Sequence, residues 1–168
     1  MRSRDRGETW KAISPDLSDE AGGERARVPA GTITMLSESP RRAGLLYAGN
    51  EGGALYVTRD DGARWDEVGR AHGLPAKWVS RVVASRHVDA RVYVAQHGFR
   101  EDDFACYLHA SDDGGQTWRS IHEGLPAQAI HVIREDPQNP SILYVGGDLG
   151  VYASHDCGKT WQSLRANL

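Results

Sequence analysis

One eight-residue pattern occurs four times in this chain, and it limits the possible folds more than any other feature. The pattern is Ser/Thr-x-Asp-x-Gly-x-x-Trp, and its aspartates are separated by 55, 53 and 43 residues. A catalytic site would hardly recur four times along one chain, whereas a structural element of a repeat protein would. We therefore expect a repeat protein in which the octet stabilises one turn of each unit. The copies are residues 3–10 (SRDRGETW), 58–65 (TRDDGARW), 111–118 (SDDGGQTW) and 154–161 (SHDCGKTW).

Two further signatures recur between the octets. Residues 38–49 (ESPRRAGLLYAG) are echoed by residues 135–146 (EDPQNPSILYVG) and more loosely by residues 86–95 (RHVDARVYVA). The tripeptide Gly-Leu-Pro occurs at 73–75 and again at 124–126. Because three independent signatures return in the same order, the chain is built from repeated structural units.

Each unit divides into four short strands rich in Val, Ile, Leu and Tyr. Four strands in about 40–45 residues is the period of a β-propeller blade. The sequence therefore predicts an all-β fold, a β-propeller arc of three four-stranded blades with one leading orphan strand, in a single domain over residues 1–168. An open arc exposes apolar faces at its ends, so we expect the remaining blades of a larger propeller, or other copies of the chain, as partners. The predicted blades are residues 32–69, 79–122 and 129–165, and the orphan strand is residues 8–13.

The octet falls at the hairpin between the third and fourth strands of each unit. An aspartate accepts hydrogen bonds from main-chain N–H groups a few residues ahead, and glycine adopts the positive φ of a tight turn. The tryptophan, three residues later, can bury its ring against the sheet. Every position thus has a structural role. The residues concerned are Asp5, Gly7 and Trp10, then Asp60, Gly62 and Trp65, then Asp113, Gly115 and Trp118, and finally Asp156, Gly158 and Trp161.

The octets resemble Asp-boxes, also called BNR repeats, which occur in sialidases, xyloglucanases and sortilin-type receptor domains. The whole chain is similar to bacterial BNR-repeat proteins labelled glycosyl hydrolase-like or sortilin-like. The resemblance implies a β-propeller, a secreted or periplasmic parent protein, and a ligand face opposite the boxes. It says little about activity, because Asp-boxes occur in enzymes and in non-enzymes. Arg64 stands where this pattern usually has threonine, so we expect a less well pinned second box.

Composition excludes several classes of function. The chain is 168 residues long with a net charge of −3 and no basic stripe, so we expect no nucleic-acid partner. No apolar run is long enough for a membrane span, and the first residues do not resemble a signal peptide. The histidines lack zinc spacing, the Asp-x-Gly turns lack the ligands of a calcium loop, and no glycine-rich loop opens a helix. We expect no metal and no cofactor. The two cysteines, Cys106 and Cys157, are predicted on opposite faces, hence as free thiols.

A ligand site is predicted on the face away from the octets, where the loops between second and third strands meet the blade-to-blade connections. The longest such loop, residues 97–104, combines charges with two flanking aromatic rings; its carboxylates could contact a ligand or metal, or simply face water. Trp78 could stack on a sugar or pack between blades. Arg81 and Arg134, on first strands, could bind a substrate carboxylate or form a salt bridge with Glu135 or Asp136. The candidate ligand-binding residues are Asn50, Glu51, Trp78, Arg100, Glu101, Asp102, Asp103 and Asp148.

Two classes of function fit these features. A glycoside hydrolase needs two carboxyl groups on either side of the scissile bond, and no pair is singled out among the acidic loop residues. The motifs that resemblance to a sialidase would require are also missing, so we name no catalytic residue. We therefore expect a binding module for a glycan or peptide, or an architectural part of a larger protein. The alternative is a part of a BNR-repeat glycoside hydrolase that uses loop carboxylates.

Overall fold

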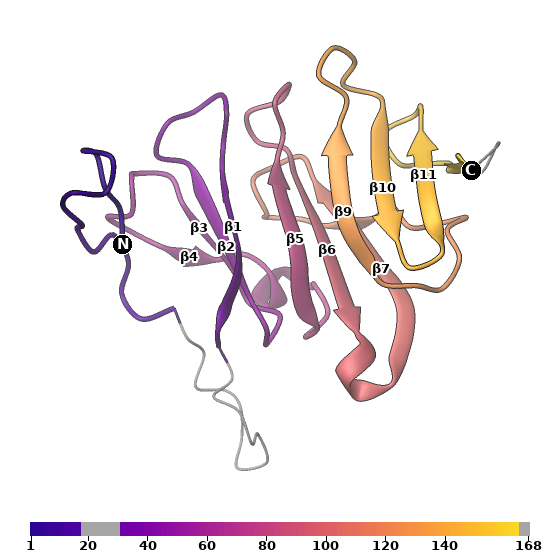
Figure 1. Ribbon diagram of the computed structural model, residues 1–168, viewed down its shortest axis with the longest axis horizontal. Helices are drawn as coiled ribbons and strands as arrows, with labels where there is room; N and C mark the ends of the chain where they lie inside the picture. The colour runs from indigo at the N-terminus through magenta and orange to yellow at the C-terminus, as the bar shows by residue number, and fades with distance from the viewer. Residues whose placement is uncertain (18–30, 165–168) are drawn as a thin grey trace.

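The computed structural model describes residues 1–17 and 31–164, and these form three four-stranded antiparallel sheets (Figure 1). In each sheet the strands follow one another in chain order, as in a propeller blade. The first blade holds β1 (Ile33–Glu38), β2 (Leu46–Asn50), β3 (Leu55–Thr58) and β4 (Asp66–Glu67), followed by the short 3₁₀ helix η1 (Arg70–His72). The second holds β5 (Trp78–Ala84), β6 (Val92–Gly98), the 3₁₀ helix η2 (Phe99–Glu101), β7 (Asp103–Ser111) and β8 (Arg119–Ser120). The third holds β9 (Ile130–Glu135), β10 (Leu143–Gly147), β11 (Gly150–Ser154) and β12 (Gln162–Ser163).

The blades pack face to face, and the middle blade contributes to two hydrophobic cores. Successive side chains of a strand point to opposite faces of the sheet. In β6, Val92 and Val94 accordingly join the core shared with the first blade, while Tyr93 and Ala95 join the core shared with the third. This is why residues 92–95 of β6 are apolar without alternation: both faces of the strand are buried.

The inner strands β1, β5 and β9 lie side by side (Figure 1), and side chains of one blade bind the main chain of the next. The Thr34 hydroxyl donates to the carbonyl oxygen of Val79 at 2.7 Å, and the Ser80 hydroxyl donates to that of Ile130 at 2.8 Å. Ser and Thr at these positions therefore join the blades and occupy carbonyl groups on the strand edges.

The third octet shows how an Asp-box closes its hairpin. The Asp113 carboxylate accepts hydrogen bonds from the Ser111 hydroxyl at 2.7 Å, the Thr117 N–H at 2.9 Å and the Thr117 hydroxyl at 2.6 Å. The Gly115 N–H, in a residue with φ of 94°, donates to the Ser111 hydroxyl. The Thr117 hydroxyl, followed by its N–H, lowers the pKa of Asp113 to about 2.

The second octet makes fewer of these bonds. Asp60 accepts the Thr58 hydroxyl at 2.8 Å and the Arg64 N–H at 2.9 Å, but Arg64 has no hydroxyl to donate. The pKa of Asp60 is still lowered, mainly by the Arg64 N–H. The expected weaker second box thus corresponds to one missing hydrogen bond.

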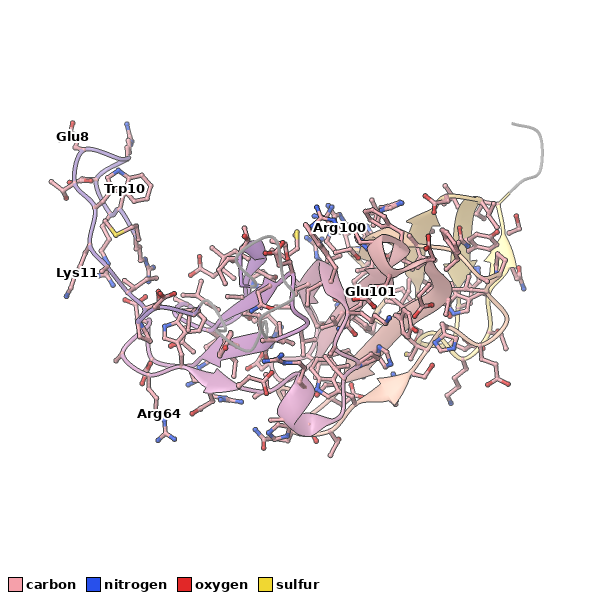
Figure 2. The ribbon with its side chains drawn as sticks, turned by 90° about the horizontal axis from the view of Figure 1, so that it is seen from below. Glu8, Trp10, Lys11, Arg64, Arg100 and Glu101 are labelled. Carbon is pink, nitrogen blue, oxygen red and sulfur yellow. The ribbon has the colours of Figure 1, made fainter. Side chains whose placement is uncertain are left out.

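Each box tryptophan after the first binds the main chain of the preceding segment, and Trp118 and Trp161 thereby join two blades. The indole Nε1 of Trp118 donates to the main-chain oxygen of Val68 at 2.7 Å, and that of Trp161 to Ile121 at 2.7 Å. Trp65 makes the same bond to Ile13 at 2.8 Å. Trp10 differs: it is 59% exposed, donates to its own Gly7 at 3.1 Å, and stands with Glu8 and Lys11 away from the sheets (Figure 2).

Two features of the predicted strands are corrected. The fourth strands, predicted over residues 63–68, 116–122 and 159–164, are only two residues long, because the N–H groups of Arg64, Thr117 and Thr160 bind box aspartates instead of a neighbouring strand. The orphan strand at 8–13 is also wrong. Residues 8–13 form no strand: one isolated bridge pairs Arg2 with Lys11, and hydrogen bonds of the Asp5 carboxylate close the turn between them. Residue 165, the predicted end of the third blade, lies outside the described residues.

The third blade leaves part of one face uncovered. Val132, Gly146 and Val151 lie in one cross-strand row, and both valines are exposed, whereas the next row belongs to the buried core. Exposed apolar side chains at an end of the arc agree with the expected open arc. Cys106, buried in β7, and Cys157, in the fourth box, are free thiols as predicted.

Candidate ligand-binding face

The candidate site lies at the end of the blades opposite the Asp-boxes, around η2, at the bottom of Figure 1. Asn50, Gln96 and Gly147 occupy equivalent positions on the second strands of their blades. Each pairs with a residue near the start of the first strand of the same blade, which is Ile33, Val79 or Ile130. The residues that follow, Glu51, His97 and Asp148, are therefore equivalent. One ionisable side chain per blade stands at this point, and its type differs from blade to blade.

Arg100 links the first and second blades at this site. Its guanidinium carbon lies 4.0 Å from the centre of the Trp78 ring, a cation–π contact. Its Nη1 lies 3.7 Å from the Glu51 carboxylate, whose side chain is only 11% exposed. The structure thus brings together Arg100, Trp78 and Glu51, three of the predicted ligand-binding residues. Figure 2 shows Arg100 beside Glu101 on η2.

A row of rings continues from Trp78 toward the third blade. His97 stacks on Trp78 with centroids 5.7 Å apart, and Phe99 covers His97 at 4.3 Å. His131 lies 6.4 Å from His97 and binds the Asp148 carboxylate at 2.7 Å. Burial, and then the charge of His131, lowers the pKa of His97, while the bond from His131 lowers that of Asp148. Neutral His97 and ionised Asp148 are favoured at neutral pH.

The acidic residues of the η2 loop form a second, separate cluster around Lys77. The ammonium group contacts the carboxylates of Glu101 and, at 2.9 Å, Asp103, which also accepts the Tyr107 hydroxyl at 2.6 Å. The Lys77 bond, and then the Tyr107 bond, lowers the pKa of Asp103 to about 2. Asp102 adopts φ of 56° at the end of η2 and is exposed. Of the four charged loop residues, only Arg100 therefore contacts Trp78 and Glu51.

Buried amide side chains underlie this face. Asn50 accepts the Ala54 N–H at 2.8 Å, so it closes its own turn, and Gln96 donates to the main chain of Pro75 and Lys77. Gln128 accepts the Leu149 N–H at 2.8 Å and fills the space beside Gly147, where a Cβ would lie 2.4 Å from the Gln128 oxygen. Four buried polar atoms here have no hydrogen-bond partner among the described residues. They are Asn50 Nδ2, Gln96 Oε1, His97 Nδ1 and Gln128 Nε2.

Sequence reasoning missed His97, Lys77 and His131. The repeat contained the signal for His97, because it follows Gln96 as Glu51 follows Asn50 and Asp148 follows Gly147. Lys77 and His131 carry no comparable sign, since their roles depend on how neighbouring blades are placed.

Ion pairs and hydrogen bonds engage most of the ionisable side chains at this face. In the described part of the chain no group of three or more His, Cys, Asp or Glu side chains is placed to hold a metal. A glycosidase acid needs a carboxyl group with a raised pKa, whereas hydrogen bonds lower the pKa values of Asp103 and Asp148. Over the same residues no helix is long and apolar enough to cross a membrane.

Comparison with known proteins identifies the repeat and the fold. A family model described as "BNR/Asp-box repeat" matches residues 109–120, the third octet and its flanks. The oligoxyloglucan-reducing end-specific xyloglucanase of Emericella nidulans is 27% identical over 129 residues, which are 70% of this chain and 15% of that protein. The chain has the β-propeller fold and carries Asp-box repeats.

Solved structures agree with this fold. The GH74 enzyme of Niastella koreensis superimposes with a TM-score of 0.63 at 18% identity, over 80% of this chain and 22% of that one. YCF48 bound to D1 peptide gives a TM-score of 0.63 at 18% identity, over 96% of this chain and 45% of that one. The chain spans less than half the length of each of these relatives. At such identities the likeness to solved structures establishes the fold alone.

Proposed function

We propose that this propeller segment binds an oligosaccharide on the face formed by Glu51, Trp78, His97, Arg100 and Asp148, and that it does not itself cut the sugar. The observation that carries the proposal is the continuous row of rings, from Trp78 through His97 to Phe99, flanked by ion-paired carboxylates. Sugars present apolar faces and a rim of hydroxyls, so rings beside fixed polar groups suit them.

Two features support binding over catalysis. Both carboxylates nearest the rings have a cationic or imidazole partner, Arg100 for Glu51 and His131 for Asp148. The bond from His131 lowers the pKa of Asp148, whereas a general acid must hold its proton. The buried unpaired atoms of Gln96 and His97 add polar groups close to the rings.

A second candidate is a part of a glycoside hydrolase, favoured by the similarity to a xyloglucanase. In that case the same face contributes sugar contacts while catalytic carboxylates come from another part of the protein. The parent protein would then be exported, as the resemblance to secreted Asp-box proteins implies. Both candidates require sugar binding at this face.

A glycan array containing xyloglucan oligosaccharides, run beside a peptide array, tests the proposal. We expect glycan binding that Trp78→Ala and Arg100→Gln each weaken at least tenfold, because one removes the ring and the other the cation that orders it. Trp10→Ala is the matched control, since it removes an exposed tryptophan on a different part of the chain. The control should bind normally.

The outcomes separate the alternatives. Binding to peptides alone, or glycan binding that survives both changes at Trp78 and Arg100, contradicts the proposal. Release of reducing sugar by the purified chain would contradict both candidates, because neither places the catalytic carboxylates in this chain.

A further inference from the structure

A second groove, of about 540 Å³, runs along the inner strands at the opposite end of the blades. β1 and β9 end at Glu38 and Glu135, which line it, so it opens at the same end as the Asp-box hairpins. Its walls are basic and aliphatic. The side chains that matter here are Met35, Arg81, Arg86, Arg134, Pro137 and Tyr144.

Three arginines of the groove have no acidic partner. Arg81 donates from Nε to the main-chain oxygen of His131 at 3.2 Å, and Arg134 donates from Nη1 to that of Ile133 at 2.8 Å. Arg86, two residues after β5, is exposed. Within residues 1–17 and 31–164, no carboxylate lies within ion-pair distance of any of the three. The salt bridges expected for Arg81 and Arg134 are therefore not formed.

The nearby carboxylates are engaged elsewhere. Glu135 is buried and accepts the Ser85 hydroxyl at 2.7 Å, the Arg86 main-chain N–H at 2.8 Å and the Tyr93 hydroxyl at 3.1 Å. Asp136 accepts two main-chain N–H groups of its own turn, which lower its pKa. Glu38 lies 3.9 Å from Arg2. The guanidinium charges of the groove are thus left without a neutralising partner.

The groove recognises a ligand through side chains more readily than through strand pairing. Among the main-chain groups of the lining, the Ala84 N–H already donates to the Ser37 hydroxyl at 3.1 Å. A peptide adding itself as an extra strand would need such main-chain groups free. Guanidinium groups, in contrast, match carboxylates in a planar, two-bond geometry.

We propose that this groove binds an extended acidic peptide segment. Its carboxylates pair with Arg81, Arg86 and Arg134, and its aliphatic side chains lie against Met35 and Pro137. A peptide fits better than an acidic sugar because Tyr144 is the only aromatic ring among the described residues of the lining, and its hydroxyl donates to Asp136 at 3.5 Å. The site is separate from the proposed sugar face, and it stands whether or not that face binds sugar.

Fluorescence anisotropy with a labelled ten-residue peptide of alternating Glu and Val tests this site. We expect binding that weakens with added salt, and no binding of the matching Gln/Val peptide. Combined Arg81→Gln, Arg86→Gln and Arg134→Gln should weaken binding at least tenfold. The control Arg6→Gln, Lys11→Gln and Lys159→Gln removes the same charge outside the groove and should change binding less than twofold. Thermal melts check that both variants fold.

Several results would overturn the proposal. These are equal binding of the Gln/Val peptide, retained binding by the groove variant, or equal loss in the control variant. Binding of oligogalacturonate as tight as that of the acidic peptide would overturn the choice of a peptide. Trp78→Ala serves as the cross-check, because it should leave peptide binding unchanged even where it abolishes glycan binding.

Discussion

The two ends of the blades differ in how completely their polar side chains are hydrogen-bonded. At the Asp-box end, the same residue types return in each blade and satisfy one another: the carboxylates of Asp113 and Asp156 each accept a hydroxyl and an N–H from the threonine four residues ahead. At the loop end, the equivalent residues Glu51, His97 and Asp148 differ, and buried polar atoms lack partners. The residues that repeat from blade to blade thus have a structural role, whereas the residues that differ between blades form the candidate site.

The largest effect should come from the tryptophan that joins two blades. Trp118→Ala removes a ring packed on the first core and its bond to Val68, so we expect a loss of about 2–4 kcal/mol in unfolding free energy. Trp10→Ala should cost under about 1 kcal/mol, because that ring is exposed. Urea titrations measure both. Equal losses would show that the joining role of the box tryptophan is wrong.

The next effect depends on pH. Burial, and then the charge of His122, lowers the pKa of His109 from 6.5 to about 4. The unfolded chain therefore binds a proton at this histidine that the folded chain does not. Above pH 6.5 His109 is neutral in both the folded and the unfolded chain. As the pH falls toward 4, only the unfolded chain gains the proton, so the unfolding free energy decreases by up to about 3 kcal/mol.

Unfolding free energies measured between pH 7 and 4 test this, with His109→Gln as the comparison. The variant should show a clearly shallower slope in that window. The Asp-boxes act at lower pH: the pKa values of Asp113 and Asp156 are about 2, so their contribution is lost below about pH 4. An unchanged slope between pH 7 and 4 would contradict the assignment to His109.

A smaller effect compares the second and third boxes. Thr117→Val removes the hydroxyl bond to Asp113 and should cost about 1 kcal/mol. Arg64→Thr supplies the missing hydroxyl to Asp60 and should raise the melting temperature, since the exposed Arg64–Asp66 pair that it removes contributes little. Differential scanning calorimetry of both variants is the measurement. A lower midpoint for Arg64→Thr would count against the hydrogen-bond explanation.

The smallest effect on stability is expected at the candidate site. Arg100→Gln removes a half-exposed cation from the Trp78 ring and should change the unfolding free energy by less than about 0.5 kcal/mol. A loss as large as that of Trp118→Ala would mean that the loop end is structural too.

The sequence was sufficient for the fold because the octets and the strand pattern repeat. Blade order, the hairpin position of the boxes and the free thiols all follow from local patterns. The length of the fourth strands did not, because the box N–H groups bind aspartate side chains, a competition that a strand pattern does not reveal. The predicted orphan strand over residues 8–13 was wrong, because these residues form only one isolated bridge, between Lys11 and Arg2.

The candidate site was predictable only in part. The repeat register places Glu51 and Asp148 at one point, and it would have added His97. It could not show that Glu101 and Asp103 turn to Lys77 while Arg100 turns to Trp78, because these choices depend on packing between blades. The unpaired arginines of the inner groove were equally hidden, since Glu135 follows Arg134 directly in the chain yet is buried in other bonds.

The central claim is that the glycan binds at the loop end and that the Asp-box hairpins take no part in glycan binding. The five tryptophans provide a direct test, because four lie in boxes and Trp78 lies in the site. Indole N–H signals in a ¹⁵N-labelled sample, assigned with Trp→Phe variants, can be followed during titration with the best glycan of the array. We predict that the Trp78 signal shifts in a saturable way while those of Trp65, Trp118 and Trp161 stay in place. Shifts confined to the box tryptophans would contradict the account.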